Sequence, residues 1–144
     1  MKKITLGFSP CPNDTFIFDA LVNKRIPTGS FQFEPVLSDV EQLNIMASEA
    51  RLDVTKISLG AYSRVSQHYL ILDSGSALGK GVGPLLVSKK FIPKSELSQA
   101  TVAIPGLHTT ANLLLSTFFP EIVKKTECVF SEIETRQFPA FEYR

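Results

Sequence analysis

Apolar residues follow two spacings along this chain. Ile4, Leu6 and Phe8 alternate with polar or small neighbours, which is typical of a β-strand, and the apolar positions after residue 14 recur at helical spacing. Ser38 and Glu41 have the capping-box form of a second helix start. Up to residue 98 the pattern predicts strands at 2–8, 31–36, 53–58, 69–73 and 84–88, and helices at 14–24, 38–50 and 60–67. This alternation indicates a mainly parallel sheet covered on both faces.

The pattern restarts near residue 100, after a polar connector. It predicts a short strand at 101–104, a Pro-Gly turn, an apolar helix at 109–119 and a further strand at 127–130. These are fewer elements than a second sheet needs. The sequence therefore predicts an α/β protein with a first lobe at 1–98 and an incomplete second lobe at 99–144.

Composition narrows the class of protein. Hydrophobic residues make up 44% of the chain and charged residues 20%, and no apolar run approaches the ~20 residues of a membrane span. The formal net charge is +1 with Lys and Arg scattered, so no nucleic-acid partner and no membrane contact are expected. The polar stretch 9–14 interrupts the apolar residues too early for an export signal, and we expect a cytoplasmic protein.

The segment 7–16, Gly-Phe-Ser-Pro-Cys-Pro-Asn-Asp-Thr-Phe, lies where the first strand gives way to the first helix. Small ligands of open α/β sheets bind beyond the carboxyl ends of strands, where the first amides of the next helix are free. Asn13 and Asp14 are therefore candidate ligand-binding residues. The alternative is a rigid turn in which Asn13 or Asp14 only caps the helix.

A second candidate segment is Thr-Lys-Ile-Ser at 55–58, at the end of a predicted strand. The strand period places Lys56 and Ser58 on one side and Ile57 on the other, so both polar groups can face a cleft. With equal weight, Lys56 is a solvated charge and Ser58 a helix cap.

The third candidate segment is Gly-Leu-His-Thr-Thr-Ala at 106–111. Thr109 and Thr110 at a helix start present hydroxyls and free amides, which suit a carboxylate or a sugar hydroxyl, although a simple threonine cap is the alternative. His108 is a general base by residue type, but no neighbouring Cys, Ser or Asp suggests a triad. Cys11 and Cys128 are far apart and without metal-ligand spacing, so two independent thiols and no metal site are expected.

The glycines of 75–83 have a spacing that suggests a nucleotide loop. They run into the predicted strand at 84–88 instead of a helix, and Gly-Lys is not followed by Ser or Thr, so the nucleotide fingerprints do not fit. We expect these glycines to allow a crossing between lobes or a close approach to a ligand. The residues alone thus predict a cleft that binds a small polar or anionic organic molecule.

Four segments together resemble one known family. Residues 7–16, 55–58, 75–85 and 105–111 are similar, in order, to the signature segments of the 1,4-dihydroxy-6-naphthoate synthases of the futalosine route to menaquinone. The resemblance implies a two-lobed fold of the type II periplasmic-binding-protein kind and a cytoplasmic lyase that uses no metal or organic cofactor. It also implies a substrate, cyclic dehypoxanthine futalosine, and substrate contacts at Lys56, Ile57, Ser58, Thr109 and Thr110.

The family's proposed proton acceptor is a histidine in a His-Glu-x-Arg-Phe-x-Tyr segment, which residues 135–144 do not match. We therefore assign no catalytic residue to this chain, expect a truncated chain that is inactive alone, and expect self-association through the incomplete second lobe. The alternatives are the chorismate dehydratase of the same pathway, which shares the fold, and a solute-binding protein.

Overall fold

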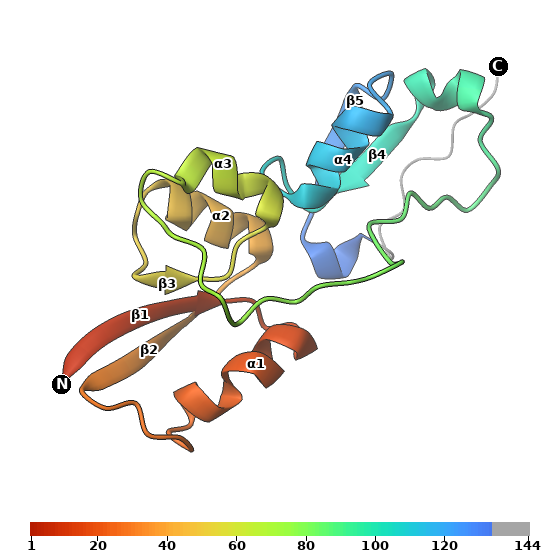
Figure 1. Cartoon of the computed structure of the whole chain (residues 1–144). Helices are drawn as coiled ribbons and strands as arrows, with labels where there is room; N and C mark the ends of the chain where they lie inside the picture. Colours follow the sequence, from red (N-terminus) through yellow and green to blue (C-terminus); the bar gives the residue numbers. More distant parts are fainter. Residues whose placement is uncertain (134–144) are drawn as a thin grey trace.

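The computed structural model describes residues 1–133 and contains two parallel sheets (Figure 1). The strands and α-helices are β1 (Lys2–Phe8), α1 (Pro12–Val22), β2 (Phe31–Leu37), α2 (Val40–Ser48), β3 (Val54–Thr55), α3 (Tyr62–Val65), β4 (Thr101–Ile104), α4 (Thr110–Phe118) and β5 (Lys124–Glu127). Short 3-10 helices lie at Leu59–Ala61, Lys94–Gln99 and Phe130–Glu132. The α/β class predicted from the sequence is confirmed, and none of the helices in this part of the chain has the length and apolar character of a membrane span.

The first sheet has the strand order β2-β1-β3, with all neighbours parallel. Gly7 of β1 lies opposite Thr55 of β3, so the carboxyl ends of these two strands are adjacent. Helix α1 covers one face of the sheet, and α2 and α3 lie on the other face (Figure 1). This arrangement follows from parallel strands joined by crossover helices.

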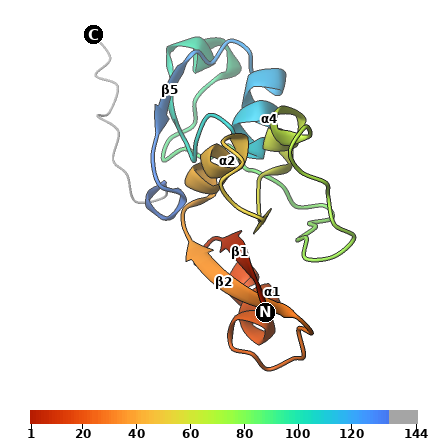
Figure 2. The ribbon, with the colours of Figure 1, turned by 90° about the vertical axis from the view of Figure 1, so that its left-hand side faces the viewer.

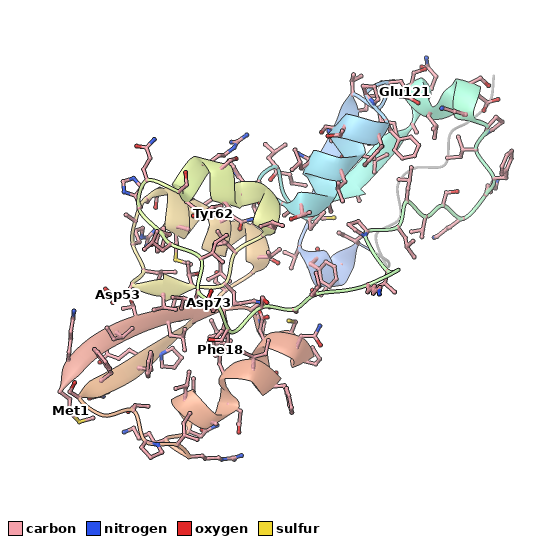
Figure 3. The ribbon with its side chains drawn as sticks, in the orientation of Figure 1. Met1, Phe18, Asp53, Tyr62, Asp73 and Glu121 are labelled. Carbon is pink, nitrogen blue, oxygen red and sulfur yellow. The ribbon has the colours of Figure 1, made fainter. Side chains whose placement is uncertain are left out.

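Apolar side chains from β1 and α1 form the core on one face of this sheet. Leu6, Phe8 and Phe18 are buried together, and the ring centroids of Phe8 and Phe18 are 5.0 Å apart. Figure 3 shows Phe18 between α1 and the sheet. Leu43 of α2 is also buried, with 1% of its surface exposed. The apolar spacing in the sequence thus marks the faces that pack.

Thr5 and Asp53 hold the short strand β3 against β1. The Thr5 N–H and hydroxyl donate to Oδ2 of Asp53 at 2.8 and 2.7 Å, and the Asp53 N–H donates back to the Thr5 hydroxyl at 2.8 Å. These donors favour the ionised carboxyl, so the pKa of Asp53 lies below its ordinary value. Hydrogen bonds therefore compensate for the two-residue length of β3.

The second sheet pairs β4 with β5, and α4 connects them. Ile104 and Ile122 are buried at 2% exposure each. Lys125 of β5 donates from Nζ to Asn112 Oδ1 at 2.9 Å and to Ser116 Oγ at 2.6 Å, which ties the strand to α4. We call β4, α4 and β5 the second body, and the sheet β2-β1-β3 with α1, α2 and α3 the first body; the order strand, helix, strand of the second body is the one that the sequence predicts.

Four predicted strands are wrong in whole or in part, and the one predicted at 53–58 is shortened to Val54–Thr55. Residues 69–73 and 84–88 form no strand, because none of the five strands in residues 1–133 pairs with them. Instead, 66–93 runs as an extended connection from the first body to the second, the long green segment of Figure 1. The strand predicted at 127–130 lies at Lys124–Glu127, since its pairing with β4 ends where Ile104 meets Glu127.

Three predicted helices also start elsewhere. The helix predicted at 60–67 is a 3-10 turn at Leu59–Ala61 followed by α3 at Tyr62–Val65. Helix α1 begins at Pro12, and the Sγ atom of Cys11 accepts the Asp14 N–H, so neither Asn13 nor Asp14 is the cap. Proline at the first helical position needs no N–H partner, which explains the earlier start. Helix α2 is capped by Asp39 and not by Ser38, and the predicted capping box does not form.

Candidate functional site

The candidate site lies beyond the carboxyl ends of three strands. β1 ends at Phe8, β3 at Thr55 and β4 at Ile104, and the segments that follow contain every residue proposed from the sequence. In Figure 1 the arrowheads of β1 and β4 point toward the region between the two sheets. Helices α1 and α4 begin there, so their first backbone N–H groups are directed to the same region.

Asp14 and Lys56 form an ion pair at this position. The Lys56 Nζ lies 3.7 Å from Asp14 Oδ1, and their side chains are 21% and 10% exposed. Oδ2 of Asp14 accepts from the Ser9 N–H at 3.1 Å and from the Ser9 hydroxyl at 2.8 Å. The segments after β1 and β3 are therefore joined through charged side chains that are largely withdrawn from water.

The glycine-rich connection reaches the same ammonium group. Lys56 donates from Nζ to the carbonyl oxygen of Gly75 at 3.1 Å, and Gly75 has a φ of +83°, which favours glycine. An ammonium has three N–H donors. Among residues 1–133 the carbonyl oxygen of Gly75 accepts one of them, and Asp14 at 3.7 Å is an ion-pair partner beyond hydrogen-bond distance, so Lys56 keeps donors for an anionic or carbonyl group of a ligand.

Ser58 is hydrogen-bonded to Asn44 of α2. Its N–H donates to Asn44 Oδ1 at 2.9 Å, and its hydroxyl accepts from Asn44 Nδ2 at 3.4 Å. Lys56 and Ser58 thus contact different helices, α1 and α2, although the sequence placed them on one side of a strand. The reason is that β3 ends at Thr55, after which the strand period no longer applies.

The two threonines of α4 have different environments. Thr109 is buried at 3% exposure and caps the helix: its hydroxyl donates to Gly106 O at 2.8 Å and accepts the Asn112 N–H at 3.3 Å. Thr110 is half-buried, and its hydroxyl accepts the Gly60 N–H at 2.9 Å across the two bodies. Thr110 therefore lies directly beside the segment that follows Ser58.

The remaining predicted residues are less connected. Asn13 is exposed and borders an open hollow of about 580 Å³ together with Phe16 and Leu78. Ile57 is half-buried between Lys56 and Ser58. His108 lines a cavity of about 250 Å³ between α3 and α4, which also includes Arg64. Residues 1–133 contain no group of three His, Cys, Asp or Glu side chains suited to a metal ion.

Sequence reasoning missed Glu41 and Asn44 of α2. Both are buried, at 7% and 2% exposure, and both contact the segment before α4. We interpreted Glu41 only as part of a capping box, so its contact with His108 was not predicted. Asn44 carried a signal, because a polar residue between Leu43 and Ala47 on the apolar face of a helix requires a buried hydrogen-bond partner.

The fold and the site together define a class. Two parallel sheets direct strand ends, helix N-termini and a half-buried ammonium toward one region, which is the arrangement of a protein that binds a small polar or anionic molecule. The chain belongs to the menaquinone biosynthesis family, whose model matches residues 4–138.

Two curated relatives share most of this chain. A 1,4-dihydroxy-6-naphthoate synthase of Thermus thermophilus is 53% identical over 118 residues, which cover 82% of this chain and 42% of the relative. The enzyme of the same name from Streptomyces coelicolor is 39% identical over 111 residues, or 77% of this chain and 38% of the relative. The chain thus spans about two fifths of the length of these relatives.

A solved structure has the same fold. The crystal structure of a protein from Archaeoglobus fulgidus superposes with a TM-score of 0.84 at 36% identity, covering 92% of this chain and 48% of that one. The mixed α/β architecture described above is therefore found in an experimental structure.

Proposed function

We propose that this chain is the substrate-binding part of a 1,4-dihydroxy-6-naphthoate synthase, a lyase that converts cyclic dehypoxanthine futalosine to 1,4-dihydroxy-6-naphthoate in menaquinone biosynthesis. The observation that carries the proposal is the similarity to two synthases over about four fifths of the chain, combined with the ammonium of Lys56 held beyond the strand ends. The product bears a carboxylate, and a half-buried ammonium with a remaining donor suits such a group.

The proposed substrate contacts are Lys56, Ile57 and Ser58 on one side and Thr109 and Thr110 on the other, with Asn13 and Asp14 at the start of α1. The hydrogen bond from Gly60 to Thr110 supports the proposal that both sides belong to one site. Because the Thr109 hydroxyl is used within its own turn, we assign ligand binding there to the backbone amides at the start of α4.

The architecture is proposed to be that of a type II periplasmic binding protein, with a first lobe at 1–98 and a second lobe that begins at 99. The two separate parallel sheets, joined by the extended connection 66–93, support this division. A cytoplasmic location is part of the same proposal. No metal or organic cofactor is proposed for the reaction.

Two separate binding titrations test the proposed function. The purified chain is titrated with 1,4-dihydroxy-6-naphthoate and, separately, with chorismate, and the dissociation constants are measured by calorimetry. We expect the naphthoate to bind and chorismate to bind at least ~10-fold more weakly, which is about 1.4 kcal/mol. Preferential binding of chorismate would instead favour the dehydratase of the same pathway.

A further inference from the structure

Glu41 at the start of α2 contacts His108, which is 67 residues away in the sequence. Its carboxylate oxygens accept the His108 backbone N–H, both at 3.1 Å, and Oε1 lies 2.5 Å from the ring Nδ1. A carboxylate only accepts hydrogen bonds, so Nδ1 carries the hydrogen and Nε2 is the ring atom left for another partner. One side chain of the first body therefore fixes both the backbone and the ring of His108.

Asn44 lies one helical turn further along the same face of α2. Its Nδ2 donates toward the His108 carbonyl oxygen at 3.4 Å, and its Oδ1 accepts the Ser58 N–H at 2.9 Å. Asn44 thus connects the segment after β3 with the segment after β4. Figure 1 and Figure 2 both show α2 above the first sheet, on the side of α4.

Two glycines permit this close contact between the bodies. A Cβ atom at Gly106 would lie 2.3 Å from the Glu41 carboxyl carbon, and the φ of Gly106 is +148°. A Cβ atom at Gly60 would lie 3.0 Å from the Thr110 Cα atom. Side chains at these positions would force the segments apart, so the contact depends on backbone shape as well as on hydrogen bonds.

We infer that Glu41 and Asn44 are positioning residues that hold the 56–58 segment and the Thr109-Thr110 turn at a fixed mutual distance for ligand binding. Neither residue is assigned a contact with the ligand. The part concerning the ligand depends on the proposed function, whereas the part concerning the two bodies depends only on the contacts described above. Glu41 holds the turn by accepting the His108 N–H. Asn44 bonds to both Ser58 and His108, so it fixes the distance between the 56–58 segment and the same turn.

The test compares the chain with Glu41→Gln and Gly106→Ala. The first removes the charge that accepts from His108, and the second displaces the carboxylate with a methyl group. Glu49→Gln is the control, because Glu49 follows the same helix and pairs only with exposed Arg51 among the residues described. Urea unfolding first establishes that each variant is folded at the assay temperature.

Three quantities are measured: the ¹⁵N shifts of the His108 ring, the orientation of the two sheets from residual dipolar couplings, and the dissociation constant for 1,4-dihydroxy-6-naphthoate. We expect both variants to shift the ring nitrogens, to change the sheet orientation and to weaken binding about 10-fold, the effect of one charge-assisted hydrogen bond. The control should match the unmodified chain in all three.

The outcomes distinguish the positioning role of Glu41 from the proposed ligand binding. An unchanged sheet orientation in Glu41→Gln overturns the positioning role, whatever the ligand. A changed orientation with unchanged naphthoate affinity overturns the link to binding. If the unmodified chain does not bind the naphthoate, the proposed function fails, while the ring shifts and couplings still decide whether Glu41 positions the turn.

Discussion

The Nζ atom of Lys56 lies 3.7 Å from Oδ1 of Asp14, which joins the residue after β3 to the first turn of α1. This ion pair is the charged centre of the proposed binding site. Asp14 is itself held by the Ser9 N–H and hydroxyl, which donate to its Oδ2, and a carboxylate in the first turn of a helix also interacts favourably with the helix dipole. The ammonium is thereby fixed before a ligand arrives.

Replacing Lys56 by Met should weaken binding of 1,4-dihydroxy-6-naphthoate by roughly 10- to 100-fold, because a hydrogen bond to a charged group contributes about 1.5–3 kcal/mol. Calorimetric titration measures the change. Lys124→Met is the matched control, since Lys124 is exposed at the opposite end of β5 from the site. Equal affinities of the two variants for the naphthoate would show that Lys56 does not bind the ligand.

The Thr5–Asp53 contact predicts a specific dependence of stability on pH. The folded state lowers the pKa of Asp53 from its ordinary value of 3.8, so the unfolded state binds the proton more readily. The stabilisation is fully present above that ordinary value and is lost as the pH falls through the lower folded pKa. Urea unfolding between pH 6 and about pH 2 measures this loss.

Asp53→Asn is the matched variant, because it has no proton to gain. The difference in unfolding free energy between the unmodified chain and Asp53→Asn should shrink as the pH falls below 3.8. A difference that stays constant over the whole range would show that the carboxylate charge contributes nothing to holding β3.

Gly7→Ala should destabilise the first sheet by roughly 1–3 kcal/mol, the usual cost of overpacking. A Cβ atom there would lie 2.6 Å from Leu52 Cδ1 and 2.7 Å from Thr55 Oγ1, where β1 pairs with β3. Gly83→Ala is the control, since nothing lies within 4 Å of a Cβ atom at that position. Denaturant unfolding compares the two, and similar midpoints would contradict the packing described for β1.

Self-association is predicted from the apolar side chains of the connection and of α4. The most exposed of these are Leu70, Leu78, Leu85 and Phe91 in the connection and Phe118 in α4, with exposures of 68% or more for each. Surfaces of this kind favour contact with a second chain. Sedimentation equilibrium should show dimers or larger species at micromolar concentration, and a monomer throughout would contradict the prediction.

Local patterns predicted β1, β2 and both helices around the candidate site, because the apolar spacing of β1 decides which of its faces is buried. Local patterns failed where a segment becomes a strand only if a neighbouring strand pairs with it. Residues 69–73 and 84–88 have strand-like sequences but no neighbouring strand in the described part of the chain. The ion pair of Asp14 with Lys56 and the contact of Glu41 with His108 join distant segments, so spacing in the sequence cannot specify them.

Catalysis by residues 1–144 alone is expected to be undetectable. The family resemblance implies a proton acceptor in a histidine segment that these residues do not contain, and a general base contributes typically ~10²–10⁴-fold. Residues 134–144 lie outside the part of the chain that the structure describes. Release of naphthoate from cyclic dehypoxanthine futalosine at a rate near that of the Thermus relative would contradict this expectation.

The central claim is that one ligand is held from both sides, by the 56–58 segment and by the Thr109-Thr110 turn. Backbone amide shifts of the ¹⁵N-labelled chain, followed during titration with 1,4-dihydroxy-6-naphthoate, test it most directly. The account predicts saturable shifts at Lys56, Ser58, Thr109 and Thr110 with a single dissociation constant. Shifts confined to one of the two segments, or located only in the hollow beside Asn13, would contradict it.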